Sequence, residues 1–240
     1  MAGMRIILVP GFWLDGSSWD DITPPLVEAG HTVEPVTLPG VERENDHRAE
    51  VTLADQVDDV VARVDASVEP VVLVGHSGGG AVIHAVVDAR PEAVTRAIYV
   101  DSLPLAEGKC INDELPVVDG VIPLPDWSVF DDADLVGMTP QIRDTFRRIA
   151  IDVPAHVAQD KQVLTDERRY DVPITVITCE FPSADLQAMA QDDDHPWHGY
   201  VHEVSLVRDV TWIDLPTGHW PQLTRPADLA AALADAVGPA

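Results

Sequence analysis

Short runs of apolar and β-branched residues alternate along this chain with longer stretches in which apolar positions recur every three or four residues. The short runs predict buried strands, and the longer stretches predict helices with one apolar face. The predicted strands are residues 5–9, 32–36, 71–74, 97–101, 174–178 and 211–215. The predicted helices are residues 18–29, 53–65, 79–88, 183–191 and 227–236. This alternation indicates an α/β fold with a mostly parallel sheet flanked by helices.

One segment, residues 103–171, interrupts the alternation. It contains scattered prolines and only short periodic stretches, one of which begins at Thr139-Pro140 and predicts a helix to about residue 150. About 70 residues are too many for a simple connection in a compact domain. We therefore expect a core of residues 1–102 and 172–240, with 103–171 as a helical cap insertion. The carboxyl edge of an open α/β sheet, where ligands bind, is its expected place.

Residues 75–79 read Gly-His-Ser-Gly-Gly and follow a predicted strand directly. The pattern Gly-x-Ser-x-Gly is typical of a nucleophile elbow, a tight turn that exposes a serine hydroxyl above the sheet. Such a turn brings backbone segments so close that the outer positions favour glycine. The helical pattern that begins at residue 79 supplies the other half of the required context. Ser77 is therefore the predicted nucleophile.

A serine hydroxyl needs a base to become a good nucleophile. His219 lies between the last predicted strand and the last predicted helix, which places it at the same sheet edge as Ser77. It also comes late in the chain, as the order serine, acid, histidine requires. His219 is therefore the predicted base.

Other histidines fit structural roles better. His76 is expected to pack beside the turn, and His84 is expected to be buried and hydrogen-bonded within the following helix. His195, His198 and His202 have a helical spacing, but a proline and a glycine interrupt it and no thiolate lies nearby. We expect no metal site and no cofactor.

Two backbone amides are the predicted donors to an oxyanion. The N–H of Gly78 belongs to the elbow itself. The N–H of Phe12 belongs to the loop after the first strand, where Gly11 allows a close approach of the backbone.

Three residues are candidates for the acid that orients His219. Glu180 and Asp185 follow the penultimate predicted strand, one slightly early and one slightly late for the usual position. Asp101 lies at the tip of the preceding strand, from which an acid can also reach the histidine. We favour Asp101 and keep Glu180 and Asp185 as alternatives.

The formal net charge of -26 changes the range of plausible partners. Nucleic acid and anionic membranes would both be repelled. The first ten residues hold too short an apolar run for a signal peptide, and no segment approaches a membrane span. Two cysteines, Cys110 and Cys179, form no disulfide framework. We expect a cytoplasmic protein with a small-molecule partner, and the sequence does not indicate an oligomeric state.

These residues resemble the α/β-hydrolase superfamily over nearly the whole chain. Several segments are similar to the branch that contains plant methylesterases, hydroxynitrile lyases and their bacterial relatives. These segments are Pro10-Gly11-Phe12-Trp13, Ser18-Trp19, residues 28–33, residues 75–79 and Gly218-His219-Trp220.

Two positions depart from that resemblance. The His-Gly that usually opens the oxyanion loop is Pro10-Gly11 here. The usual Gly-x-x-Asp after the penultimate strand is absent, which favours Asp101. An acid at that position resembles the alternative site of some haloalkane dehalogenases, although those use an aspartate nucleophile where this chain has Ser77.

The resemblance implies a serine hydrolase that cleaves a small or medium carboxylic ester or lactone through an acyl-enzyme on Ser77. The alternatives are hydroxynitrile lyase-like or cofactor-free oxygenase chemistry, and a non-catalytic ligand receptor. The lyases carry a lysine near the histidine, and this chain has none near His219. Five apolar residues of the expected cap either line a substrate pocket or form the core of the cap: Trp127, Phe130, Leu135, Met138 and Phe146.

Overall fold

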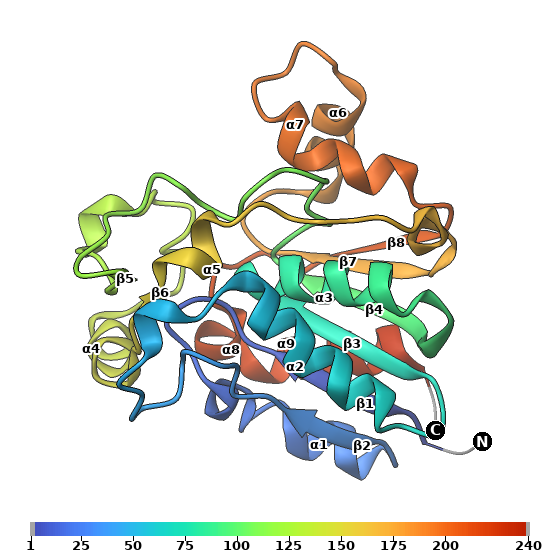
Figure 1. Cartoon of the computed structure of the whole chain (residues 1–240), viewed down its shortest axis with the longest axis horizontal. Coiled ribbons are helices and arrows are strands. Elements are labelled where there is room, and N and C mark those ends of the chain that lie inside the picture. Colours follow the sequence, from blue (N-terminus) through green and yellow to red (C-terminus); the bar gives the residue numbers. More distant parts are fainter. Residues whose placement is uncertain (1–2, 239–240) are drawn as a thin grey trace.

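A six-stranded, fully parallel sheet forms the centre of the computed structural model, which describes residues 3–238 (Figure 1). The strand order is β2-β1-β3-β4-β7-β8. The strands are β1 (Arg5–Val9), β2 (Thr32–Pro35), β3 (Val71–His76), β4 (Val94–Val100), β7 (Ile174–Thr178) and β8 (Val210–Asp214). All six predicted strands are present, with ends that differ by at most three residues, and the predicted fold class is confirmed.

Both faces of the sheet are covered by helices because its strands are apolar on both sides. In β1, Ile6 and Leu8 pack toward α1 (Thr23–Glu28) and α9 (Pro226–Val237). The alternate residues Ile7 and Val9 pack toward the opposite layer. That layer contains α2 (Leu53–Asp65), α3 (Gly78–Ala89) and part of α6 (Ser183–Gln191). Successive side chains of a strand point to opposite faces, so one short strand contributes to two cores.

The prediction of one helix over residues 18–29 is wrong. A 3-10 helix, Gly16–Trp19, comes first, and the α-helix begins only at Thr23. Pro24 and Pro25 explain the division, because proline lacks an N–H and fits only in the first turn of a helix. The apolar residues of this stretch, among them Trp19 and Ile22, are nevertheless fully buried, which produced the helical pattern.

Most of residues 103–171 lie at the end of the sheet opposite the two chain termini, whereas their last part, the 3-10 helix Glu167–Asp171, lies at the other end, next to the start of β7 (Figure 1). They contain a two-stranded antiparallel ribbon of β5 (Val121–Ile122) and β6 (Val153–Pro154), together with α4 (Pro140–Ile149) and α5 (Ala155–Gln159). The helix predicted from Thr139-Pro140 is present as α4, and the Thr139 side chain accepts a hydrogen bond from the Ile142 amide.

A second excursion joins β7 to β8. We call residues 181–206 the α6–α7 arm; it comprises α6 and α7 (His198–Val201) and projects away from the sheet (Figure 1). The last short helix before α9 is α8 (Pro221–Thr224). The remaining 3-10 helices are Arg48–Glu50, Pro91–Ala93, Trp127–Val129, Glu167–Asp171 and His202–Leu206. Within residues 3–238, no helix combines the length and the apolar character needed to cross a membrane.

Candidate active site

Ser77 lies on a sharp turn between β3 and α3, with backbone angles of φ 51° and ψ −123°. Positive φ is strained for a residue with a side chain, and such strain is typical of a nucleophile elbow. The two glycines beside it, Gly75 and Gly79, lie so close to other backbone atoms that a side chain would not fit. A Cβ at Gly75 would lie 2.5 Å from the Gly79 oxygen, and one at Gly79 would lie 2.6 Å from the Pro10 oxygen. The tight turn of the backbone therefore holds Ser77 at the position expected of a nucleophile.

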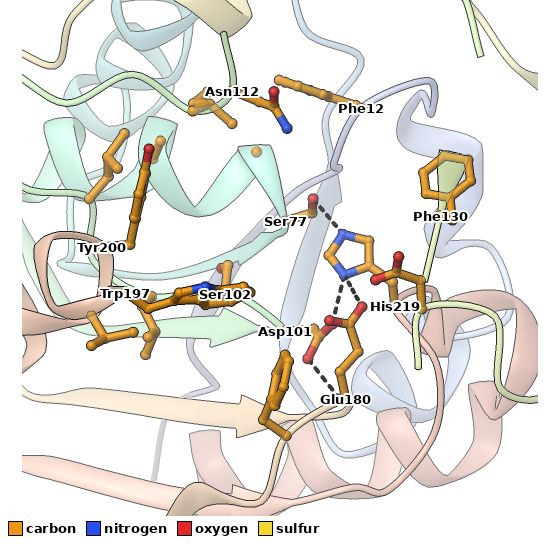
Figure 2. A pocket seen from close by; sticks show the side chains of 18 of the residues that line it. Phe12, Ser77, Asp101, Ser102, Asn112, Phe130, Glu180, Trp197, Tyr200 and His219 are labelled. Atoms are coloured by element: carbon orange, nitrogen blue, oxygen red, sulfur yellow. Dashed lines mark hydrogen bonds and ion pairs between the residues drawn. The ribbon is translucent and has the colours of Figure 1, made fainter. Parts of the chain in front are cut away.

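His219 meets Ser77 from the loop between β8 and α8. Its Nε2 lies 2.7 Å from Ser77 Oγ (Figure 2). Two hydrogen bonds of the His219 main chain hold the loop in place: the N–H donates to the backbone carbonyl of Asp134 over 2.9 Å, and the carbonyl oxygen accepts from the side-chain Nε2 of His76 over 2.6 Å. His76 is fully buried, and burial lowers its pKa to about 3, so the ring is neutral and acts as a structural donor.

Two of the three candidate acids reach the other ring nitrogen of His219. Asp101 Oδ2 lies 2.7 Å from Nδ1, and Glu180 Oε1 lies 2.9 Å from the same atom (Figure 2). Asp101 has a φ of 45°, and its Oδ1 accepts hydrogen bonds from the amides of Cys179 and Glu180. The third candidate, Asp185, lies in the first turn of α6 and does not contact His219.

The two carboxyl groups dominate the electrostatics of the ring. Burial favours neutral His219, but the carboxyl groups of Asp101 and Glu180 outweigh it and raise the pKa of the ring. Burial also disfavours the Asp101 carboxylate, yet its bonds to His219 and to two amides lower its pKa overall. Burial raises the pKa of Glu180, with the neighbouring carboxyl groups of Asp101 and Asp134 acting in the same direction. Asp101 is therefore the ionised partner of the ring at neutral pH.

The two residues whose amides are the predicted oxyanion donors, Phe12 and Gly78, are in contact. A Cβ at Gly78 would come within 2.6 Å of Phe12 Cε1, so the Phe12 ring packs directly on the elbow. Gly78 is the first residue of α3, where backbone N–H groups have no partner within the helix. Gly11 allows this approach, because a Cβ there would lie 2.8 Å from Ser77 Cβ.

A cavity of about 600 Å³ lies beside Ser77 and His219 and is lined mainly by apolar side chains (Figure 2). Residues 103–171 contribute Leu103, Leu105, Ile111, Asn112, Leu115 and Phe130, among others. The α6–α7 arm contributes Phe181, Leu186, Trp197, Tyr200 and Val201.

The expected cap residues divide between cavity and core. Phe130 lines the cavity. Four others do not line it and belong to an apolar cluster against which Phe130 also packs: Trp127, Leu135, Met138 and Phe146.

The sequence alone does not predict that the α6–α7 arm forms one wall of the cavity. Trp197 and Tyr200 are about half exposed, at 51% and 50%, and both face the cavity. Aromatic residues in an otherwise polar stretch are the signal that could have indicated this wall. Asn112 is another unexpected lining residue; its Oδ1 accepts from the amides of Glu114 and Leu115.

The side chains of Asp101, Glu180 and His219 also form the one group in residues 3–238 with the spacing of metal ligands, within 4.8 Å of one another. A metal here would bind the Nδ1 lone pair, and the ring proton would then lie on Nε2, facing Ser77. Such a ring cannot accept the serine proton. Metal binding and base chemistry therefore exclude each other at this histidine.

The sequence shows to which family a chain of this architecture belongs. The family model described as "Alpha/beta hydrolase family" matches residues 6–232. The chain belongs to the α/β hydrolase family.

This α/β hydrolase is similar to a carbendazim-hydrolyzing esterase from Nocardioides sp. (strain SG-4G), with 34% identity over 114 residues. The match covers 47% of each chain, so it spans about half the length of that relative. It is also similar to an extracellular α/β-hydrolase from a Paenibacillus species, with 21% identity, coverage of 97% and 98% of the two chains and a TM-score of 0.77. A methylesterase from Arabidopsis matches with 17% identity, 98% of each chain and a TM-score of 0.73. The two structural likenesses show a shared fold, and they include the expected methylesterase branch.

Proposed function

We propose that this α/β hydrolase is a serine esterase that cleaves a small or medium carboxylic ester or lactone. The observation that carries the proposal is the continuous contact from Ser77 Oγ through His219 to Asp101, with 2.7 Å at each step. The similarity to an esterase from Nocardioides supports the same reaction class.

In the proposed mechanism, Ser77 is the nucleophile, His219 the general base and Asp101 the acid. As Ser77 Oγ attacks the ester carbonyl, its proton passes to His219 Nε2, and Asp101 stabilises the imidazolium. The oxyanion accepts hydrogen bonds from the N–H groups of Phe12 and Gly78, each worth about 3–4 kcal/mol in the transition state.

Collapse of this intermediate breaks the bond between the carbonyl carbon and the alcohol oxygen. His219 gives its proton to the leaving alcohol, and the acyl group stays on Ser77. Water then attacks the acyl-enzyme, with His219 again taking the proton, and the carboxylic acid is released. The serine hydroxyl is restored, so the residues need no cofactor.

The proposed substrate has an apolar body, because the cavity beside Ser77 is lined mainly by apolar residues. We assign residues 103–171 as the cap over this site and residues 1–102 and 172–240 as the core. This division is supported by the place of most of the segment at one end of the sheet (Figure 1). Cytoplasmic location stays a prediction.

The test is hydrolysis of p-nitrophenyl esters of graded acyl length by the wild type and by Ser77→Ala. We expect turnover in the wild type and a loss of about a thousandfold or more in the variant, because the nucleophile is removed. Ser205→Ala, at an exposed serine of the arm, is the matched control and should retain full activity. Equal activity of Ser77→Ala and wild type would exclude the proposed acyl-enzyme. A wild type that ignores esters but cleaves cyanohydrins would indicate a lyase.

A further inference from the structure

Two carboxyl groups converge on a single N–H group behind the proposed base. Asp101 Oδ2 lies 2.7 Å and Glu180 Oε1 lies 2.9 Å from His219 Nδ1. An imidazole nitrogen carries at most one proton, so the two oxygens compete for one donor. The hydrogen-bond geometry favours Asp101. The proposed mechanism needs one acid at this place and leaves the second unexplained.

Hydrogen bonds to its other carboxylate oxygen, Oδ1, keep Asp101 ionised. Asp101 Oδ1 accepts from the Cys179 amide over 2.8 Å and from the Glu180 amide over 3.2 Å. The backbone of Glu180 therefore anchors the first acid, while its side chain returns to the same ring. These bonds stabilise the charged form of Asp101, which is why this carboxyl holds the Nδ1 proton.

Glu180 lacks such support. Its Oε1 is buried and has no hydrogen-bond partner among residues 3–238. The groups that face it from neighbouring elements are Asp101 at the end of β4, Asp134 in the cap segment and the ring of His219. Within the described chain, His219 is its one ion-pair partner. A buried carboxylate oxygen without a donor is costly, so the charge of Glu180 depends on whether the ring is protonated.

We propose that Glu180 is a second carboxylate partner of His219, which raises the basicity of the ring and holds the Nδ1 proton when Asp101 cannot. Glu180 is a positioning residue, since it acts on the substrate only through the ring. The inference rests on the proposed function for its kinetic consequences, but its effect on the ring can be measured without turnover.

The sign of the electrostatic effect follows from the charges. An ionised Glu180 stabilises the imidazolium, so it raises the pKa of His219 and the pH at which the ring becomes available as a base. Burial raises the pKa of Glu180 itself, so this charge appears at a higher pH than the charge of an ordinary glutamate. Glu180→Gln removes the charge and keeps the shape. The acid side of the kcat/KM profile should therefore move to lower pH, by about one pH unit.

Because Glu180 is proposed to hold the Nδ1 proton when Asp101 cannot, Asp101→Asn should lose less activity than the same substitution in a triad with one acid. In a triad, an asparagine at the acid position supplies an N–H where the ring needs an acceptor, and the wrong tautomer costs about 10⁴-fold in kcat. Here Glu180 Oε1 is already within 2.9 Å of Nδ1 and can accept that proton. Asp101→Asn should therefore lose about a hundredfold or less, and Asp101→Asn/Glu180→Gln should lose the full amount.

The experiment is a double-mutant cycle of these variants, with kcat/KM for one p-nitrophenyl ester measured from about pH 5 to 10. The ring is titrated in parallel by NMR, with the His219 signals assigned by comparison with His219→Gln. Asp185→Asn removes a carboxylate of α6 that does not contact His219, and its profile should match the wild type. Glu180→Asp, which keeps the charge but withdraws it from Nδ1, replaces Glu180→Gln if the latter does not fold.

The expected result is a lower pKa of His219 in Glu180→Gln and a loss in the double variant at least tenfold larger than in Asp101→Asn. Identical NMR titrations of wild type and Glu180→Gln, or identical losses in Asp101→Asn and the double variant, would overturn the inference. If Ser77→Ala stays active while the NMR titration shifts as expected, the proposed esterase mechanism fails and the second carboxylate stands.

Discussion

At the scale of single residues, the site depends on backbone conformations that the sequence indicates unequally. Ser77 and His219 are predictable, because the elbow has its own glycine pattern and the histidine follows the last strand. Asp101 has a positive φ of 45° without any glycine pattern around it. Both Asp101 and Glu180 reach the ring because of their side-chain directions at two different strand ends. Spacing along the chain does not encode those directions, so the choice of acid stays open in the sequence.

The elbow glycines carry the first prediction. Gly75→Ala should destabilise the protein by about 1–3 kcal/mol, since its Cβ would lie 2.5 Å from a backbone oxygen that cannot move freely. The measurement is the free energy of unfolding in urea. Gly199→Ala is the control, because its Cβ would meet only the flexible end of Lys109, at 3.1 Å. Equal stability of the two variants would show that the elbow tolerates a side chain.

At the scale of elements, the sequence predicts helices well where capping and periodicity agree. Helix α2 has the predicted bounds, and Thr52 and Asp55 form a reciprocal capping box at its start. Residues 18–29 fail because burial of large apolar side chains imitates a helical period across a break. The α6–α7 arm shows a further limit: the sequence predicts α6 within it, but its approach to the cavity depends on packing between distant segments.

The capping box of α2 provides the second prediction. Thr52→Ala removes the oxygen that accepts the Asp55 N–H over 3.1 Å, so stability should fall by about 1 kcal/mol. Thr52→Ser keeps that oxygen and should stay close to the wild type. Urea unfolding gives the difference, and ester hydrolysis should be unchanged in both variants. A Thr52→Ala variant as stable as Thr52→Ser would mean that the cap contributes nothing.

The aromatic wall of the arm provides the third prediction. Trp197 is 51% exposed and lines the cavity, so a long acyl chain would cover it on binding. Trp197→Ala should raise KM for long-chain p-nitrophenyl esters about tenfold, the equivalent of about 1.4 kcal/mol of lost apolar contact. The acetyl ester should change less than twofold.

Leu206→Ala is the control for that wall, since Leu206 is an exposed residue of the same arm that does not line the cavity. A KM that rises equally for short and long esters would place Trp197 outside the acyl-binding part of the cavity.

At the scale of the whole molecule, the sheet is predictable because each strand is a short, continuous apolar run with helices between. The same alternation also predicts the two apolar cores, one on each face of the sheet. The cavity is different, since its walls come from the elbow, from residues 103–171 and from the arm, which are far apart in the sequence. Only the folded topology brings them together. The sequence therefore predicts the reaction class better than the substrate.

The net charge of -26 supports the last prediction, which concerns the molecule as a whole. With 41 acidic and 15 basic residues, self-repulsion should destabilise the compact state, and salt should relieve it. Raising NaCl from about 20 to about 500 mM at pH 8 should raise the Tm by about 3 °C, which corresponds to about 1 kcal/mol for a chain of this size. Calorimetry measures it.

The same salt series near pH 5.5 is the control, because partial protonation of the carboxylates lowers the repulsion and should shrink the effect. Exposed ion pairs such as Arg90 with Asp65 and Arg168 with Glu92 act in the opposite direction, since salt weakens their attraction. Exposed pairs of this kind contribute little, so the repulsion should prevail. A Tm that falls with salt at pH 8 would show that the local pairs, and not the net charge, govern the stability of the fold.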